Sequence, residues 1–278
     1  DTQRSQKYEN LFNDFVKGLP ENSFDRLRLE AYKAWRSRDL DGSLAKFEAA
    51  RKAKPDDANL DLALSQVLMQ KERNDEAEKL LRGVIARDKT HSSAYDILYQ
   101  YYMRRNMPAE AEQIRKIKCE NNPTVLQYRL QLATHYFLTN RREETDRILN
   151  AILSDPKTFP DGREKVGDFY LTFRQFDQAL ATYKGGLGQG KEQRLTFLRK
   201  IADVYVIQGR RDEALAVLDK QILKEAPNDP VGLTLRATLW LETGNRNQLQ
   251  QAVAELETAV GKLPRNAVVR YNLGRAYW

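Results

Sequence analysis

The chain has little of the chemistry that disulfide frameworks and metal centres need. Its 278 residues include one cysteine and two histidines. A single cysteine excludes an intrachain disulfide, and so few thiol and imidazole groups leave little material for a transition-metal site. No apolar run approaches the ~18 residues that a membrane-spanning helix needs, so no membrane insertion is expected in this stretch. Because 41% of the residues are hydrophobic, the chain is expected to fold rather than to be disordered.

The net charge is basic but dispersed. Lys and Arg number 46 against 39 Asp and Glu, which leaves a formal charge of +7, and both halves of the chain share the excess evenly. Binding to nucleic acid through counterion release needs cations gathered where phosphates lie. An even mixture of both signs indicates a solvated helical surface, so no nucleic-acid partner is expected.

The dominant feature of the sequence is an internal repeat, in which three columns of residues recur together. The first column is small and recurs at Ser43, Ala77, Ala111, Thr145, Ala179, Ala214 and Ala252. The second, also mostly small, recurs at Ala31, Ser65, Tyr99, Ala133, Gly167, Ala202, Ala237 and Gly274. The third follows three residues later, at Ala34, Leu68, Tyr102, Tyr136, Tyr170, Tyr205, Trp240 and Tyr277. Three columns in register over the whole chain indicate a repeat architecture.

Each period is predicted to be a helix–turn–helix hairpin. Apolar residues fall at helical spacing, as Leu60, Leu64 and Leu68 do. A polar stretch such as residues 70–75 then separates two such runs and is too short for another element. Proline closes most periods, where a second helix must stop. Because one hairpin cannot bury its own apolar face, successive hairpins are expected to stack into an all-α solenoid.

These columns resemble the tetratricopeptide repeat family, and the resemblance covers nearly the whole chain. One close copy of its first helix is Tyr271-Asn272-Leu273-Gly274-Arg275-Ala276-Tyr277. The resemblance implies a right-handed superhelix of antiparallel helix hairpins, of a bacterial kind. Seven repeats are expected within residues 23–266, starting near residues 24, 58, 92, 126, 160, 195 and 230. Residues 1–22 are expected to be the second helix of a partial upstream repeat, and residues 267–278 the first helix of a truncated eighth.

Departures from the pattern carry their own predictions. The seventh repeat has about three extra residues at 245–248, which indicate a longer turn. The glycine run at 185–190 predicts an early end to a second helix, and whether it is a flexible joint is left open. Arg115 and Lys118 stand where the family prefers apolar residues, so this repeat is expected to pack loosely or to lay aliphatic stems along the seam.

The last half repeat is expected to leave apolar surface uncovered at Tyr271, Leu273 and Trp278. Such a face offers end-to-end self-association with a second copy as a further possible contact of this chain.

Sequence features that suggest chemistry are weak. Residues 185–191 fit the spacing G-x-x-x-x-G-K of a phosphate-binding loop, but a helix is expected before them, and Glu192 follows where Ser or Thr is needed. His91 and His135 have no ligand partner at helical spacing. Cys119 has basic neighbours that would lower its thiol pKa, but no convergent pocket. No catalytic residue, metal or cofactor is expected, and the chain is interpreted as not an enzyme.

The resemblance implies that first helices line a concave groove that binds a peptide or a partner segment. Carried over position by position, the predicted groove residues are Arg28, Tyr32, Gln66, Gln100, Thr134, Glu164, Asp168, Arg199, Asp203 and Thr238. Amides and hydroxyls there suit hydrogen bonds to a partner's backbone. Asp161, Glu164, Asp168 and Asp203 suggest an acidic stretch for a basic partner, diluted by Lys165, Arg199 and Lys200.

The expected function is a non-enzymatic scaffold for a protein or peptide partner of unknown identity. The alternative is a targeting or assembly module of a larger enzyme, or of a secretion or envelope complex, whose activity lies outside these residues. RNA binding is disfavoured because the predicted groove is acidic. The compartment stays open between a bacterial envelope or periplasm and the cytoplasm.

Overall fold

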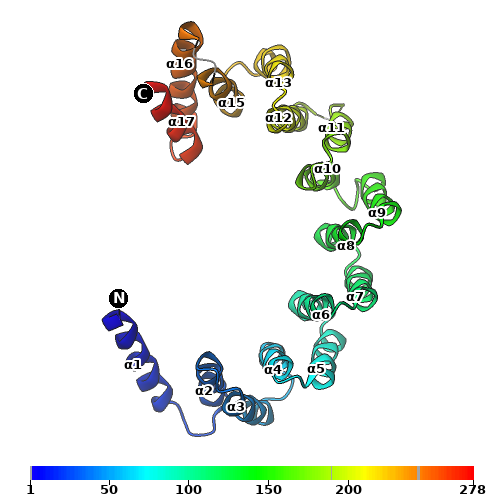
Figure 1. Ribbon diagram of the computed structural model, residues 1–278, viewed down its shortest axis with the longest axis vertical. Helices are drawn as coiled ribbons and strands as arrows, with labels where there is room; N and C mark the ends of the chain where they lie inside the picture. The colour runs from blue at the N-terminus through cyan, green and yellow to red at the C-terminus, as the bar shows by residue number, and fades with distance from the viewer. Residues whose placement is uncertain (1, 189, 243–244) are drawn as a thin grey trace. The chain divides into compact units, whose positions relative to one another are not determined.

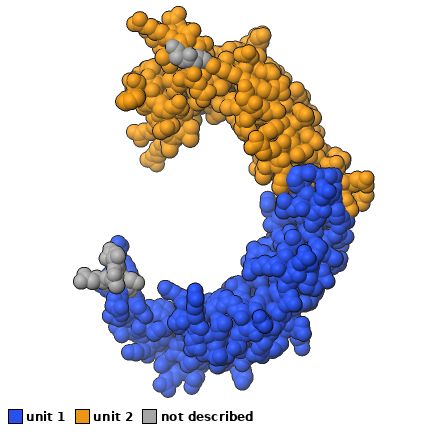
Figure 2. Space-filling model, viewed as in Figure 1, with its two compact units in different colours: residues 1–142 blue, residues 143–278 orange. Residues whose placement is uncertain are grey.

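The computed structural model describes residues 2–188, 190–242 and 245–278, and every regular element in those ranges is a helix. Two compact units, Asp1–Arg142 and Glu143–Trp278, divide the chain (Figures 1 and 2). Unit 1 contains α1 (Thr2–Gly18), α2 (Phe24–Arg36), α3 (Leu40–Ala53), α4 (Ala58–Gln70), α5 (Asn74–Arg87), α6 (Ser92–Arg104), α7 (Pro108–Asn121) and α8 (Leu126–Leu138). Helix α9 (Arg142–Ser154) begins at the boundary. Unit 2 continues with α10 (Gly162–Thr172), α11 (Phe176–Lys184), α12 (Lys191–Ile207), α13 (Arg211–Val217), η1 (Leu218–Ile222), α14 (Leu223–Glu225), α15 (Pro230–Leu241), α16 (Arg246–Lys262) and α17 (Ala267–Tyr277).

Consecutive helices pack against one another as hairpins. In unit 1 each helix from α2 to α8 contacts the next, and α2, α4, α6 and α8 lie along one side of the unit with α3, α5 and α7 along the other (Figure 1). We call these the first and second helices. In unit 2 the contacts of α10 with α11, α12 with α13, and α15 with α16 repeat the arrangement. The all-α hairpin fold predicted from the sequence is confirmed.

Small residues of the first helices face large residues of the second helices. Ala31 and Phe47 are both fully buried in one hydrophobic cluster of unit 1. The closest fit is in unit 2, where a Cβ added to Gly167 would lie 2.1 Å from Cε1 of the buried Tyr183. The small column is therefore the space into which the second helix inserts its largest side chain.

A common main-chain turn joins the two helices of a hairpin. The N–H of Asp39 donates to the carbonyl of Ala34 at 2.9 Å, and equivalent bonds reach the carbonyls of the third column. The residue before each of these donors has a positive φ, at Arg38, Glu72, Asn106, Asn140, Arg174 and Gly209. The left-handed residue lets the chain reverse direction while the last carbonyls of the first helix stay hydrogen-bonded.

Extra residues in unit 2 lie within helices. One extra residue is accommodated by the π-helical turn η1. Ala214, Leu218 and Ile222 are all fully buried. The last two of these buried positions are therefore four residues apart, whereas the usual spacing between the equivalent positions is three residues. The longer turn predicted at 245–248 is wrong, because residues 246–248 open α16. Asn245 caps that helix by accepting hydrogen bonds from the backbone of its first turn. Thr243 and Gly244, which precede Asn245, lie outside the described residues.

The glycine run has the predicted effect on its helix. Helix α11 ends at Lys184 after nine residues, whereas α3, α5 and α7 each have 14. Gly186 has no room for a side chain, since a Cβ there would lie 2.3 Å from Cε2 of Phe197. Gln189, which belongs to the same run, lies outside the described residues, and a flexible joint stays a prediction.

The last helix exposes two of the three residues predicted to be uncovered. Tyr271 and Trp278 are exposed. Leu273 is half-buried against the cluster that contains Ala252 and Leu256, so its predicted exposure is wrong. Self-association through this end stays a prediction. In the described ranges, no helix is long and apolar enough to cross a membrane.

Candidate functional site

A cleft between α4 and α6 on the first-helix side of unit 1 contains two of the predicted groove residues. Its volume is ≈ 650 Å³, and the lining residues are Gln66, Met69, Gln70, Glu72, Asn74, Ile97, Gln100, Tyr101, Arg104 and Arg105. Gln66 and Gln100 hold equivalent positions in successive repeats, so the repeat itself places two side-chain amides in the same cleft. Between them lies apolar surface from Met69, Ile97 and Tyr101. The structure thus brings together two of the predicted residues.

Hydrogen bonds hold the edges of this cleft. Trp35 Nε1 donates to Gln70 Oε1 at 2.9 Å, which ties α2 to α4. Arg104 donates from Nη2 to Gln100 Oε1 at 3.2 Å. The side-chain oxygens of Gln70 and Gln100 thus accept hydrogen bonds from within the protein. The NH2 groups of these two side chains keep donors for an incoming carbonyl.

The rim of the cleft is more cationic than anionic. Arg104 and Arg105 are exposed, and the guanidinium of Arg105 lies 5.6 Å from the ring centre of Tyr101. Glu72 is the one carboxylate that lines the cleft within the described part of the chain. The described rim therefore carries a net positive charge.

The other predicted residues of unit 1 are engaged within the protein. Tyr32 packs edge-on against Phe47, and burial raises the pKa of Tyr32. Arg28 binds Asp25 at 3.1 Å. Thr134 Oγ1 donates to the carbonyl of Leu130 at 2.8 Å, within its own helix. These three side chains thus have partners within the protein, and their role in a groove stays a prediction.

The acidic stretch predicted in unit 2 is partly engaged in contacts within the unit. Asp168 Oδ1 accepts hydrogen bonds from Tyr183 and from Lys200 Nζ, both at 2.7 Å. Lys200 Nζ also lies 3.5 Å from Glu164. Burial alone would lower the pKa of Lys200, but the two carboxylates outweigh it and the net shift is upward. Burial raises the pKa of Asp203. Glu164 and Asp168 thus share Lys200 within unit 2, and attraction of a basic partner by this stretch stays a prediction.

The two remaining predicted residues bind their own unit. Arg199 makes a two-pronged contact with the buried carboxylate of Asp229, with Nε 3.1 Å from Oδ2. Thr238 Oγ1 donates to the carbonyl of Thr234 at 2.7 Å. Both side chains thus have hydrogen-bond partners within unit 2, and their place in a groove stays a prediction.

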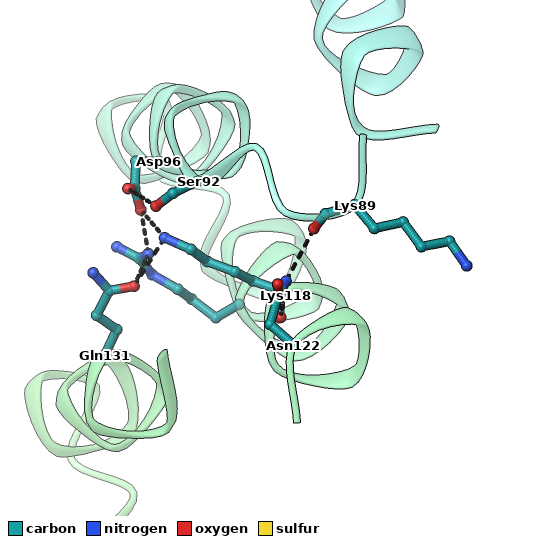
Figure 3. A network of polar contacts seen from close by, with 7 residues as sticks. Lys89, Ser92, Asp96, Lys118, Asn122 and Gln131 are labelled. Atoms are coloured by element: carbon teal, nitrogen blue, oxygen red, sulfur yellow. Dashed lines mark hydrogen bonds and ion pairs between the residues drawn. The ribbon is translucent and has the colours of Figure 1, made fainter. Parts of the chain in front are cut away.

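A buried polar cluster in unit 1 was missed as a site by the sequence analysis (Figure 3). From α7, Arg115 Nη1 and Lys118 Nζ both bind Asp96 Oδ1, at 2.6 and 2.8 Å. The same two nitrogens contact Gln131 Oε1 on α8, at 2.7 and 3.1 Å. Lys118 is completely buried and Arg115 is 9% exposed. We call these four residues the cation cluster.

Aromatic rings complete the cation cluster. The guanidinium of Arg115 lies 3.9 Å from the ring centre of Tyr99, and Lys118 Nζ lies 4.2 Å from that of Tyr128. Burial lowers the pKa of Lys118. Burial would raise the pKa of Asp96, but the two cations outweigh it and lower it overall. Of the two predicted outcomes for this repeat, the structure therefore shows buried side-chain stems rather than loose packing.

The other residues considered for chemistry are packed away. Burial raises the pKa of the Cys119 thiol despite its basic neighbours, so the predicted lowering is wrong. His135 is buried, with Nδ1 3.4 Å from the hydroxyl of Tyr99. His91 stands at the N-terminus of α6, and its Nδ1 has no hydrogen-bond partner among the residues that the structure describes. Among the described residues, no group of three or more His, Cys, Asp or Glu side chains is placed to hold a metal.

The stacked hairpins, the small-to-large packing between their helices and the shared turn define a helical-repeat protein. Residues 34–101 match the family model of the tetratricopeptide repeat, and the same columns continue on both sides of that match. The fold is of the tetratricopeptide-repeat type, and the family match itself covers residues 34–101. This fold is a scaffold for protein–protein interaction, and its members are generally non-catalytic. The matched residues include most of the cleft.

Solved structures of similar chains are distant in sequence. A tetratricopeptide repeat protein from Parabacteroides merdae is 14% identical, covering 92% of this chain and 99% of that one, with a TM-score of 0.43. The C-terminal part of a repeat protein from Cytophaga hutchinsonii is 15% identical, covering 95% and 92%, with a TM-score of 0.47. Yeast Tom70 is 16% identical, covering 98% and 58%, with a TM-score of 0.44. No curated protein sequence matches the chain.

Proposed function

We propose that this protein is a non-enzymatic interaction module that binds an extended segment of a partner protein along the first helices of unit 1. The cleft between α4 and α6 is the centre of the site. Residues 23–266 act in this proposal as seven repeats, with a partial repeat on either side.

The observation that carries the proposal is the combination of surfaces within the cleft. Gln66 and Gln100 offer amide groups from adjacent repeats, and Ile97 and Met69 offer apolar wall between them. An extended peptide presents alternating backbone polar groups and side chains. Its backbone would bind the amides while one apolar side chain enters the cleft, and that burial supplies most of the affinity.

The proposal predicts that filling the cleft abolishes peptide binding. Gln100→Trp places a large ring at its mouth from an exposed position on α6, and Gln113→Trp makes the same change at an exposed position on α7. Random displayed peptides are selected on the wild-type protein, and the recovered sequences are titrated against all three proteins. We expect Gln100→Trp to weaken binding on the order of tenfold or more, since an interface anchor is worth about 2 kcal/mol, while Gln113→Trp binds as the wild type does.

Two results would contradict this site. Peptides that bind wild type and Gln100→Trp equally well place the site elsewhere. Equal weakening by the two tryptophan variants indicates a general effect of the substitution. Circular dichroism of each variant checks that the helices are intact before binding is compared.

A further inference from the structure

The cation cluster carries more positive than negative charge. Arg115 and Lys118 bring two cations to a single carboxylate, that of Asp96, and the remaining acceptor is the neutral amide oxygen of Gln131. Burying charge is unfavourable unless it is paired and hydrogen-bonded. The cluster therefore holds an unbalanced positive charge beneath the first-helix face.

A second observation shows that the hydrogen bonding is also incomplete. Arg115 is more than nine-tenths buried, and its Nε–H has no acceptor among the described residues. Asp96 and Gln131 both bind Nη1 of Arg115 instead. The edge of the guanidinium that contains Nε, which suits a two-pronged contact with a carboxylate, is therefore not used. Arginine favours two parallel hydrogen bonds to one carboxylate, and this site supplies them only in part.

Gln131 is the residue through which a ligand would reach the cations. Its side chain is half-buried and extends from α8, a first helix, over the two nitrogens (Figure 3). Asp96 lies on α6 and is one-third exposed at its side chain. The two outer members of the cluster thus lie on the partner-facing helices, while the cations lie below them on α7.

We propose that the cation cluster is a binding site for a carboxylate of the partner segment, which displaces the amide of Gln131 and pairs with Arg115 and Lys118. The inference rests on the proposed function, because α6 contributes to both sites. It adds a specificity: the bound segment is acidic, and its carboxylate lies toward α8 from the apolar residue that enters the cleft between α4 and α6.

The charge imbalance is tested without any partner by Gln131→Glu. This substitution supplies the missing carboxylate from within the chain, and Gln127→Glu makes the same change at an exposed position of α8. We expect Gln131→Glu to have a higher thermal midpoint than both wild type and Gln127→Glu, whose carboxylate gains only the small benefit of a place in the first turn of α8. Glutarate, a small dicarboxylate, is then titrated at constant ionic strength. It is expected to raise the midpoint of wild type and Gln127→Glu but not that of Gln131→Glu.

The displayed peptides test the specificity. Sequences recovered on wild type are expected to be enriched in Asp and Glu, and Gln131→Glu is expected to bind them on the order of tenfold more weakly, as the loss of a charge-assisted hydrogen bond implies. Each peptide is made with a free and with an amidated C-terminus. Equal binding of both forms identifies an Asp or Glu side chain as the ligand, whereas loss on amidation identifies the terminal carboxylate.

The outcomes separate the two proposals. The carboxylate site is overturned if the thermal midpoint of Gln131→Glu is no higher than that of Gln127→Glu, or if glutarate affects both variants equally. Either result overturns it even if Gln100→Trp abolishes peptide binding. Conversely, peptides that ignore Gln100→Trp but lose affinity in Gln131→Glu contradict the cleft and support the carboxylate site.

Discussion

Replacing Gly167 by alanine probes the packing between first and second helices at its tightest point. The new Cβ would lie 2.1 Å from Cε1 of Tyr183 and 2.6 Å from Cδ1. Ordinary carbon contacts are about 3.5–4.0 Å, so the ring would have to move by roughly 1.5 Å. Tyr183 is completely buried and its hydroxyl donates to Asp168 at 2.7 Å. The ring therefore has no free space and a hydrogen bond to lose.

The expected cost follows from these contacts. Overpacking a core of this kind costs about 1–3 kcal/mol, and losing a hydrogen bond to a charged group costs about 1.5–3 kcal/mol. Alanine regains about 1 kcal/mol of helix propensity over glycine. We expect Gly167→Ala to lower the free energy of unfolding by about 2–4 kcal/mol.

Urea unfolding followed by far-UV circular dichroism measures the effect against a matched variant. Gly83 lies inside α5, where the nearest atom to an added Cβ is Arg87 Nη1 at 3.6 Å. Gly83→Ala is therefore expected to stabilise the protein by about 0.5–1 kcal/mol. In a Tyr183→Leu background the penalty of Gly167→Ala should shrink by about 1 kcal/mol or more, because neighbouring residues are not additive. An unfolding midpoint for Gly167→Ala at or above that of wild type would refute the packing argument.

Two further predictions concern buried charge. Asp61 has a fully buried side chain that binds Arg51 Nε at 2.8 Å and Arg87 Nη2 at 2.5 Å. Asp61→Ala leaves two partly exposed guanidinium groups rather than a buried one. We therefore expect the free energy of unfolding in urea to fall by about 1–3 kcal/mol. An unchanged unfolding midpoint would show that this ion pair does not stabilise the protein. The pKa of Asp96 is lowered by Lys118 and Arg115 against the opposing effect of burial. The contribution of Asp96 to the free energy of unfolding is therefore complete above the carboxyl pKa of the unfolded chain, about 3.9. It is lost as the pH falls toward the lower pKa of Asp96 in the folded protein. Unfolding midpoints measured across this acidic range should fall less steeply in Asp96→Asn than in wild type, and parallel profiles would contradict the assignment.

The repeat columns predicted the fold because they encode packing directly. A small residue in the first helix and a large one in the second are both visible in the sequence, as Ala31 and Phe47 are. The same columns marked Arg115 and Lys118 as departures. What they could not show is the carboxylate on α6 and the amide on α8 that meet these cations, because the three helices converge only in space.

The groove residues were predicted by position, and position alone does not tell which side chains are available. Thr134 and Thr238 turn their hydroxyl groups back to their own helices, a choice that serine and threonine make often in helices. Asn245 was a signal that the sequence did contain. An asparagine before a run of helix-forming residues predicts a helix start, and it would have placed residues 246–248 in α16.

The π-helical turn η1 has a consequence for how such a chain can change its length during evolution. An inserted residue usually survives in a loop, where it disturbs little. Here one residue is wound into a buried second helix, and Leu218 and Ile222 still reach the interior. The following hairpin keeps its capped start at Asp229. A length change is thus absorbed within one repeat, and an alignment of this chain with its relatives should open the gap inside the helix.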